Sequence, residues 1–243
     1  MNIKMSWLGG AGFVIKADGI TVGVDLYLSN ACMRPDGSFK RLTPAPAKPD
    51  GLNLDYLIAS HEHGDHLDIG SLKQLVNKNN STCLIAPTTA IVEAKKILGN
   101  EISSERFIIL NRGESYKSQK FTVRACLADH GTDSIDAIGF FLCVGNKNIY
   151  FIGDTCFRTD MSEIVKPDII DIMLVPINGR FGNPDSKEAA YFMQMFKPGL
   201  TIPCHYWLFA EHGGDPGEFL RQSDVIAPGH KKYLMAIGEE KEF

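Results

Sequence analysis

Three histidines and one aspartate lie within six residues of the chain, in the string H-E-H-G-D-H at residues 61–66. Because side chains alternate along an extended segment, His61 and His63 point the same way and can bind one cation. Asp65 and His66 follow a glycine, so their side chains can turn toward a second metal position. Imidazole nitrogen and carboxylate oxygen suit Zn²⁺, and also Mn²⁺ or Fe. The string therefore predicts a metal site; the alternatives are an exposed histidine-rich loop and a helix cap.

Further potential ligands come directly after predicted strands, where loops of an α/β scaffold meet. They are His130, Asp154 and His205, which follow the predicted strands 121–127, 148–152 and 200–203. Each one alone has an ordinary structural explanation, since a histidine at a strand end is often only hydrogen-bonded and Gly-Asp-Thr is often a turn. Together, in this order, they are predicted to complete the site.

The elements that must position these residues alternate between strands and helices, which favours α/β layers over an all-β sandwich. Short β-branched and aromatic segments predict a meander and further strands at 3–7, 12–16, 20–25, 55–59, 82–86, 106–110, 121–127, 138–144, 148–152, 169–176, 200–203 and 232–237. Helices are expected at 68–76, 87–99, 159–165, 186–196 and 216–221. Residues 29–54 hold four prolines and no periodicity, so we expect a long functional lid rather than a linker.

The composition indicates an ordinary globular protein and excludes several classes. The 243 residues are 44% hydrophobic and 22% charged, with a formal net charge of −4. Collagen, coiled-coil and disordered chains differ from this, and no apolar run is long enough to span a bilayer. We expect a single domain over residues 1–243, cytoplasmic because no signal peptide is evident, with six reduced cysteines. Neither a membrane nor nucleic acid is an expected partner, and a homo-oligomer is left open.

With the segments 7–13, 24–28, 153–155 and 202–206, these residues resemble the metallo-β-lactamase fold superfamily. Within it, the chain is similar to the L-ascorbate-6-phosphate lactonase-like (UlaG-like) metal-dependent hydrolases, although that lactonase is a longer chain. The resemblance implies a four-layer αββα sandwich with two divalent metal ions, Zn or Mn with Fe as an alternative, at one edge between the sheets. Carried over by position, the ligand sets are His61, His63 and His130 for one metal, Asp65, His66 and His205 for the other, and Asp154 as the bridge.

Such a centre predicts hydrolysis. Bound metal lowers the pKa of water from about 15.7 toward about 7, and the resulting hydroxide would attack a carbonyl carbon or a phosphorus. Asp65 can accept a proton or orient the nucleophile, and Asp25 is expected to support the site from behind a ligand. His212 is the first candidate for the acid that protonates the leaving group; its alternative is a loop histidine without a role.

Three further residues are candidates for binding substrate. Asn178 and Arg180 lie in a glycine-containing segment after a predicted strand, and Tyr206 adjoins His205. Arg180 could equally form a surface ion pair, and core packing is the commoner fate of a residue such as Tyr206.

The leading function is therefore hydrolysis of a small molecule, a lactone or a phosphorylated sugar lactone. A phosphodiesterase or nuclease of the same fold is the alternative, which the net charge disfavours. A flavodiiron-like redox protein would carry H-x-E-x-D, whereas position 63 is histidine. A binding module without activity would be expected to have lost ligands, and all seven positions are filled.

Overall fold

Two β-sheets form the centre of the molecule in the computed structural model, which describes residues 2–77, 81–99, 102–167 and 169–243. The first sheet has the order β13-β1-β2-β3-β4-β5-β6 and the second the order β12-β11-β10-β9-β8-β7. The strands of the first are β1 Lys4–Gly9, β2 Gly12–Ala17, β3 Ile20–Val24, β4 Tyr56–Ile58, β5 Cys83–Ala86, β6 Phe107–Ile109 and β13 Glu240–Glu242. Those of the second are β7 Ser115–Lys117, β8 Phe121–Leu127, β9 Ile138–Val144, β10 Lys147–Phe151, β11 Ile172–Pro176 and β12 Leu200–Cys204.

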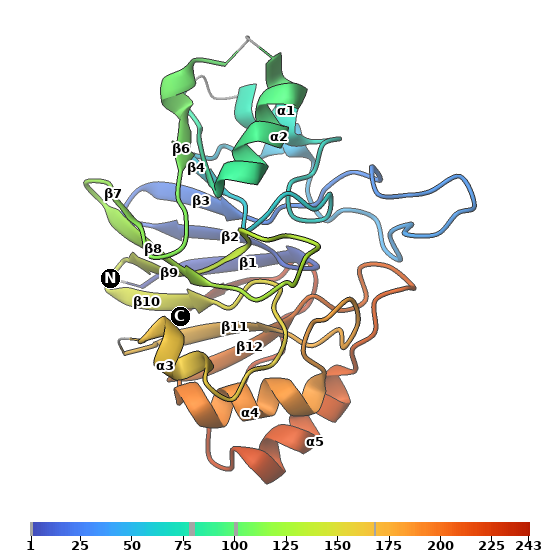
Figure 1. The fold of residues 1–243 in the computed structure, drawn as a ribbon, viewed down its shortest axis with the longest axis vertical. Helices are drawn as coiled ribbons and strands as arrows, with labels where there is room; N and C mark the ends of the chain where they lie inside the picture. The colour runs from blue at the N-terminus through green and yellow to red at the C-terminus, as the bar shows by residue number, and fades with distance from the viewer. Residues whose placement is uncertain (1, 78–80, 100–101, 168) are drawn as a thin grey trace.

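Helices cover the outer face of each sheet, so the expected αββα sandwich is confirmed. In Figure 1, α1 and α2 lie on one side of the paired sheets and α4 and α5 on the other. The helices are α1 Leu72–Asn77, α2 Thr88–Leu98, α3 Met161–Val165, α4 Ser186–Phe196 and α5 Pro216–Ile226. Among the described residues, no helix is long and apolar enough to cross a bilayer.

Strand β2 shows how the sequence builds these layers. Phe13 and Ile15 belong to the core between the sheets, whereas Val14 packs in the second core, under α1 and α2. Successive side chains of a strand point to opposite faces, so an unbroken apolar run is required wherever both faces are covered. Burying each such side chain contributes about 1.5–3 kcal/mol.

Strand direction brings the predicted ligands to one edge. Strands β3 to β6 pair in parallel, and so do β10, β11 and β12. Strand β8 is antiparallel to β9, which is antiparallel to β10, so β8 runs in the same direction as β10. Within each sheet these strands run in the same direction, so the loops after β8, β10 and β12 leave from one edge of the second sheet, and the loop after β4 leaves from the carboxyl edge of β3 to β6 in the first. The carboxyl edge is where α/β sheets place functional groups.

Most element predictions are confirmed, but the predicted strand 232–237 is wrong. There the chain makes one bridge, between Thr201 and Lys232, and the last strand forms later as β13. The bond from Gly238 N to Trp7 O brings the chain to the edge of β1, where β13 pairs with residues 4–6. Strand β7 was not predicted because its residues are polar and largely exposed at the edge of the second sheet.

Candidate metal centre and substrate pocket

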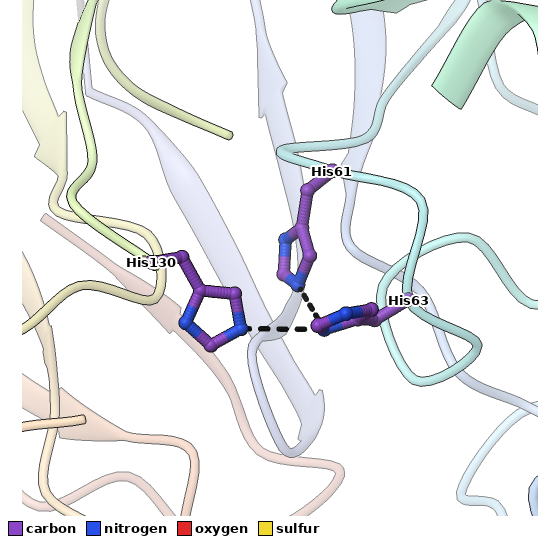
Figure 2. Close-up of side chains that lie close together, drawn as sticks. All are labelled: His61, His63 and His130. Atoms are coloured by element: carbon purple, nitrogen blue, oxygen red, sulfur yellow. Dashed lines mark hydrogen bonds between the residues drawn. The ribbon is translucent and has the colours of Figure 1, made fainter. Parts of the chain in front are cut away.

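Three histidine rings meet at the edge between the sheets (Figure 2). The Nε2 atom of His61 lies 3.0 Å from Nδ1 of His63, and Nε2 of His130 lies 3.3 Å from that same Nδ1. His61 and His63 come from the loop after β4, and His130 comes from the loop after β8. Nitrogens bound tetrahedrally at about 2.0–2.1 Å from a zinc ion lie about 3.3–3.4 Å apart. The three rings therefore already have the spacing that a shared cation requires.

A second group of donors adjoins the first. Nε2 of His66 lies 3.0 Å from Nε2 of His205 and 3.4 Å from Oδ2 of Asp154. Oδ2 of Asp65 lies 3.3 Å from Nε2 of His205. Asp154 also lies within 4.8 Å of His61 and His66 as a potential metal-binding set, so it stands between the two groups. The structure brings together all seven predicted ligands, which we call the floor.

Buried polar partners orient the floor. Asp25 accepts hydrogen bonds from the backbone N of Ser60 at 2.7 Å and from its hydroxyl at 2.8 Å, and it faces Nδ1 of His66 at 2.9 Å. A carboxylate behind a histidine sets the tautomer and direction of the ring, so the contact fits the supporting role expected of Asp25. Asn183 donates to Oδ2 of Asp154 at 2.7 Å, a contact that the sequence did not reveal.

The electrostatics of the floor show strong coupling between acids and imidazoles. Burial lowers the pKa of His66, but the carboxylates of Asp154, Asp65 and Asp25 outweigh burial and raise that pKa well above its ordinary value. Burial raises the pKa of Asp154, but His205 and His66 outweigh it and hold that pKa well below its usual range. The imidazoles of the floor thus hold the pKa values of both Asp65 and Asp154 below the usual range, so these two carboxylates remain charged at the site.

The donor set fits divalent metal. The carboxylates of Asp154, which is buried, and Asp65, which is half-buried, supply negative charge, and the facing imidazole nitrogens need a shared cation or protons to avoid opposing lone pairs. Nitrogen and carboxylate donors at these positions match the preferences of zinc, manganese and iron. His and Asp clusters able to bind metal are therefore present at this edge.

A cavity of about 470 Å³ opens above the floor, a size suited to a small molecule. His212 lines it, with its ring stacked on His205 at 4.7 Å and its Nε2 atom 3.8 Å from Oδ2 of Asp65. Burial, followed by the neighbouring His205, lowers the pKa of His212 to about 4. The imidazole is therefore neutral at pH 7, which favours a ligand or hydrogen-bond role over the proton donation expected from the sequence.

The predicted substrate-binding residues do not reach this cavity. Asn178 and Arg180 line a separate depression. Tyr206 is buried, with its ring 5.0 Å from that of Trp7. The left-handed backbone at His205, where φ is 58°, turns His205 into the cavity and the next side chain toward the core.

Other residues, which the sequence reasoning did not select, surround the cavity instead. We call four of them the rim: Arg34, Phe39, Phe181 and Phe209. Arg34 and Phe39 belong to the loop 29–54, so the prediction of a functional lid was the one sequence signal that pointed toward them.

The fold and this site together define the class. Residues 4–205 match the beta-lactamase superfamily domain, and the chain belongs to that superfamily. It is also 30% identical over 225 residues to a protein of Carboxydothermus hydrogenoformans named "UPF0173 metal-dependent hydrolase", covering 89% of this chain and 90% of that relative. The chain is therefore a member of this metal-dependent hydrolase family.

Solved structures share the fold at lower identity. Igni18, described as a novel metallo hydrolase from the archaeon Ignicoccus hospitalis KIN4/I, is 20% identical and gives a TM-score of 0.79, covering 100% of this chain and 99% of that one. An isothiocyanate hydrolase from Delia radicum gut bacteria is 18% identical with a TM-score of 0.75, covering 99% of this chain and 98% of that one.

Proposed function

We propose that this protein hydrolyses a small-molecule ester through a dinuclear metal centre. In this proposal His61, His63 and His130 hold one ion, Asp65, His66 and His205 hold the second, and Asp154 lies between them. The observation that carries it is the convergence of these donors, at 3.0–3.4 Å for the closest pairs, at the base of one cavity. They come from both sheets, which supports a single hydrolase domain over residues 1–243.

Bound metal would supply Lewis acidity and a water of lowered pKa at this position. The chain's own residues would do the remaining work. Asp65 projects toward the cavity beside His205 and can orient an attacking water or accept its proton. Asp25 holds the ring of His66 from behind, so that Nε2 faces the centre.

His212 would contact the departing group. Its ring lines the cavity next to His205, and its Nδ1 atom has no hydrogen-bond partner among the described residues. A neutral imidazole can donate an N–H hydrogen bond to an oxygen that gains negative charge, as other enzymes use one to polarise a carbonyl. This role requires no protonated histidine and agrees with the lowered pKa of His212.

The proposed substrate class is a lactone or a phosphorylated sugar lactone, after the resemblance to the UlaG-like hydrolases, with zinc or manganese as the metal. The structural likeness to an isothiocyanate hydrolase adds a second electrophile, with a carbon that water can attack, to those worth assaying. Fold alone does not choose between them, because one fold serves many chemistries.

The test is metal content by elemental analysis of the purified protein, together with turnover of lactones, sugar-phosphate lactones, phosphodiesters and an isothiocyanate. We expect about two equivalents of Zn or Mn and hydrolysis that is lost on chelation and restored by the metal. Turnover of phosphodiesters alone would show that the substrate is a phosphodiester and not a lactone. Absence of bound metal together with absence of metal-restored turnover would overturn the proposal.

A further inference from the structure

The loop 29–54 is fixed against the cavity by polar contacts. Arg41 is buried and donates from Nη1 to the backbone O of Tyr27 at 2.5 Å. Leu42 N bonds to Leu208 O at 2.9 Å, and Arg41 forms a bridge with Phe209. In Figure 1 this loop, which joins β3 to β4, extends on the same side of the sheets as the loops after β11 and β12. Segments distant in sequence thus build one wall of the cavity.

That wall is aromatic. The ring centroid of Phe39 lies 5.9 Å from that of Phe181 and 5.6 Å from that of Phe209. The rings of Phe181 and Phe209 lie 5.9 Å and 4.8 Å from that of His212. Phe181 and Phe209 therefore contact the histidine proposed to contact the leaving group, and Phe39 packs on both of them. Rings in this arrangement offer flat apolar surfaces and edges on which another ring can pack.

Two of the phenylalanines are held at a cost. The φ angle is 55° at both Phe39 and Phe181, in the left-handed region that bulky residues rarely adopt. Phe181 is also 52% exposed, although burying such a ring is favourable. Strained backbone of this kind costs of order 1–3 kcal/mol per residue and clusters at functional sites. Both side chains line the cavity; Phe39 also packs against Tyr27, Leu208 and Phe209, whereas Phe181 leaves half of its surface for a ligand to cover.

Arg34 adds a positive charge to this wall. Its guanidinium carbon lies 4.4 Å from the centroid of the Phe39 ring, a cation–π contact that fixes the group while leaving N–H donors at its edge. Among the described residues that line the cavity, it is the single lysine or arginine. No carboxylate of a described residue lies within 4 Å of it as an ion pair; Asp36, two residues along the loop, is hydrogen-bonded to Ser38 instead.

We propose that Arg34 and the three rim phenylalanines select a substrate with a flat apolar ring that bears one carboxylate, remote from the bond that is hydrolysed. The inference rests on the proposed hydrolase function and narrows its substrate class. The ring would pack against Phe39, Phe181 and Phe209, and the carboxylate would accept the paired N–H donors of Arg34. The reacting group would then lie over the floor.

The rim argues for a carboxylate over a phosphate and for a ring over a sugar. One arginine matches a singly charged group, and Asp133, which lines the same cavity and is not among the proposed metal ligands, would oppose a dianion. A sugar needs several hydrogen-bond partners for its hydroxyls, and three phenylalanine rings supply none. The rim therefore disfavours the phosphorylated sugar lactone within the class proposed above.

The test compares ligands of equal shape and different charge on the purified metal-containing protein. The probes are 3-phenylpropanoate, its neutral amide 3-phenylpropanamide, and propanoate, which lacks the ring, each titrated by ligand-observed NMR. We expect wild type to bind the phenyl acid about tenfold tighter than the amide, and tighter than propanoate. Arg34→Gln should abolish the preference for acid over amide, and Arg34→Lys should restore part of it. Arg221 is an exposed arginine on α5 outside the cavity. Arg221→Gln therefore removes the same charge as Arg34→Gln and should leave the affinities for the three probes unchanged.

Phe181→Ala should weaken the binding of the phenyl acid and of the amide alike, and it should leave the affinity for propanoate unchanged. If Arg34→Gln keeps the full preference, the carboxylate binds elsewhere, for example at the metal centre, and the inference is overturned. If the preference depends on Arg34 but the protein holds no metal and shows no metal-restored turnover, the binding specificity of the rim stands and the hydrolase proposal fails. If turnover is found but the three probes bind equally, the hydrolase proposal stands and this inference fails.

Discussion

The floor and the rim lie a few ångströms apart and are built in different ways. The floor consists of histidines and aspartates on the loops after β4, β8, β10 and β12, most of them buried and tied by hydrogen bonds. The rim consists of one exposed arginine and three phenylalanines, two of them on the long loop 29–54 and two on loops after β11 and β12. Most groups of the floor lie within a few residues of a strand end, whereas the groups of the rim lie farther along their loops.

The difference separates two tasks of one site. Groups that hold a metal must converge within a few tenths of an ångström, which short, well-packed loops provide. Groups that recognise a substrate are commonly on loops, which can change without disturbing the scaffold. Substitutions in the floor should therefore change metal content and turnover together, and substitutions in the rim should change substrate preference alone.

Removal of the metal should have the largest effect. Chelation should reduce turnover to background and lower the melting temperature, because ligand bound to the native state at about 1,000 times its Kd contributes about 4 kcal/mol. For a domain of this size that corresponds to roughly 10 °C. Differential scanning calorimetry before and after dialysis against chelator measures it. An unchanged melting temperature and unchanged activity would contradict a metal site in the floor.

Asp154→Ala should nearly match metal removal in its effect on activity. The substitution removes the carboxylate between the two groups of donors and takes one of the negative partners from the imidazoles of His66 and His205. We expect kcat/KM to fall about a thousandfold, beyond the roughly 10–100-fold loss typical of residues behind the ligands. Metal content should fall below two equivalents. Asp50→Ala, at an exposed aspartate outside the cavity lining, serves as control. Retention of both metals and turnover in Asp154→Ala would refute the two-metal assignment.

Asp25→Asn should have an intermediate effect. The amide keeps the size of the side chain but loses the charge that faces Nδ1 of His66 and one acceptor for the bonds from Ser60. Metal affinity should fall about 10–100-fold, while far-ultraviolet circular dichroism stays unchanged. Competition with a metal-sensitive dye measures the affinity, and Asp18→Asn in an exposed turn is the matched control. Equal affinities in the two variants would show that Asp25 does not position His66.

Phe181→Ala should have the smallest effect and should act on the rim alone. The ring is half exposed, so the melting temperature should change little, whereas KM for a ring-bearing substrate should rise about three- to tenfold with kcat unchanged. Steady-state kinetics and metal analysis on the same preparation separate the two parameters. Val225→Ala, an exposed residue on α5, controls for loss of apolar surface. A loss of metal in Phe181→Ala would remove the distinction between floor and rim.

Much of the fold was predictable because local patterns carried it. The helix 186–196 and the strands 121–127 and 138–144 appear with the predicted bounds, since apolar periodicity and the Asp185 capping box are local signals. The predicted last strand failed because strand pairing depends on a free edge elsewhere in the chain, here that of β1. Arg180 and Tyr206 were plausible neighbours of the site in sequence, but the backbone direction after β11 and β12 sends them away from the cavity.

The sequence by itself determined the chemistry of the floor. Four of its seven ligands lie in one short string on the loop after β4, and the other three follow strands that the residue pattern reveals. Only the tertiary structure identified the residues of the rim. Arg34, Phe39, Phe181 and Phe209 come from different loops and form no recognisable motif in the sequence. A metal ligand set requires particular residue types at fixed offsets, whereas an apolar wall requires only that distant loops pack together around one cavity.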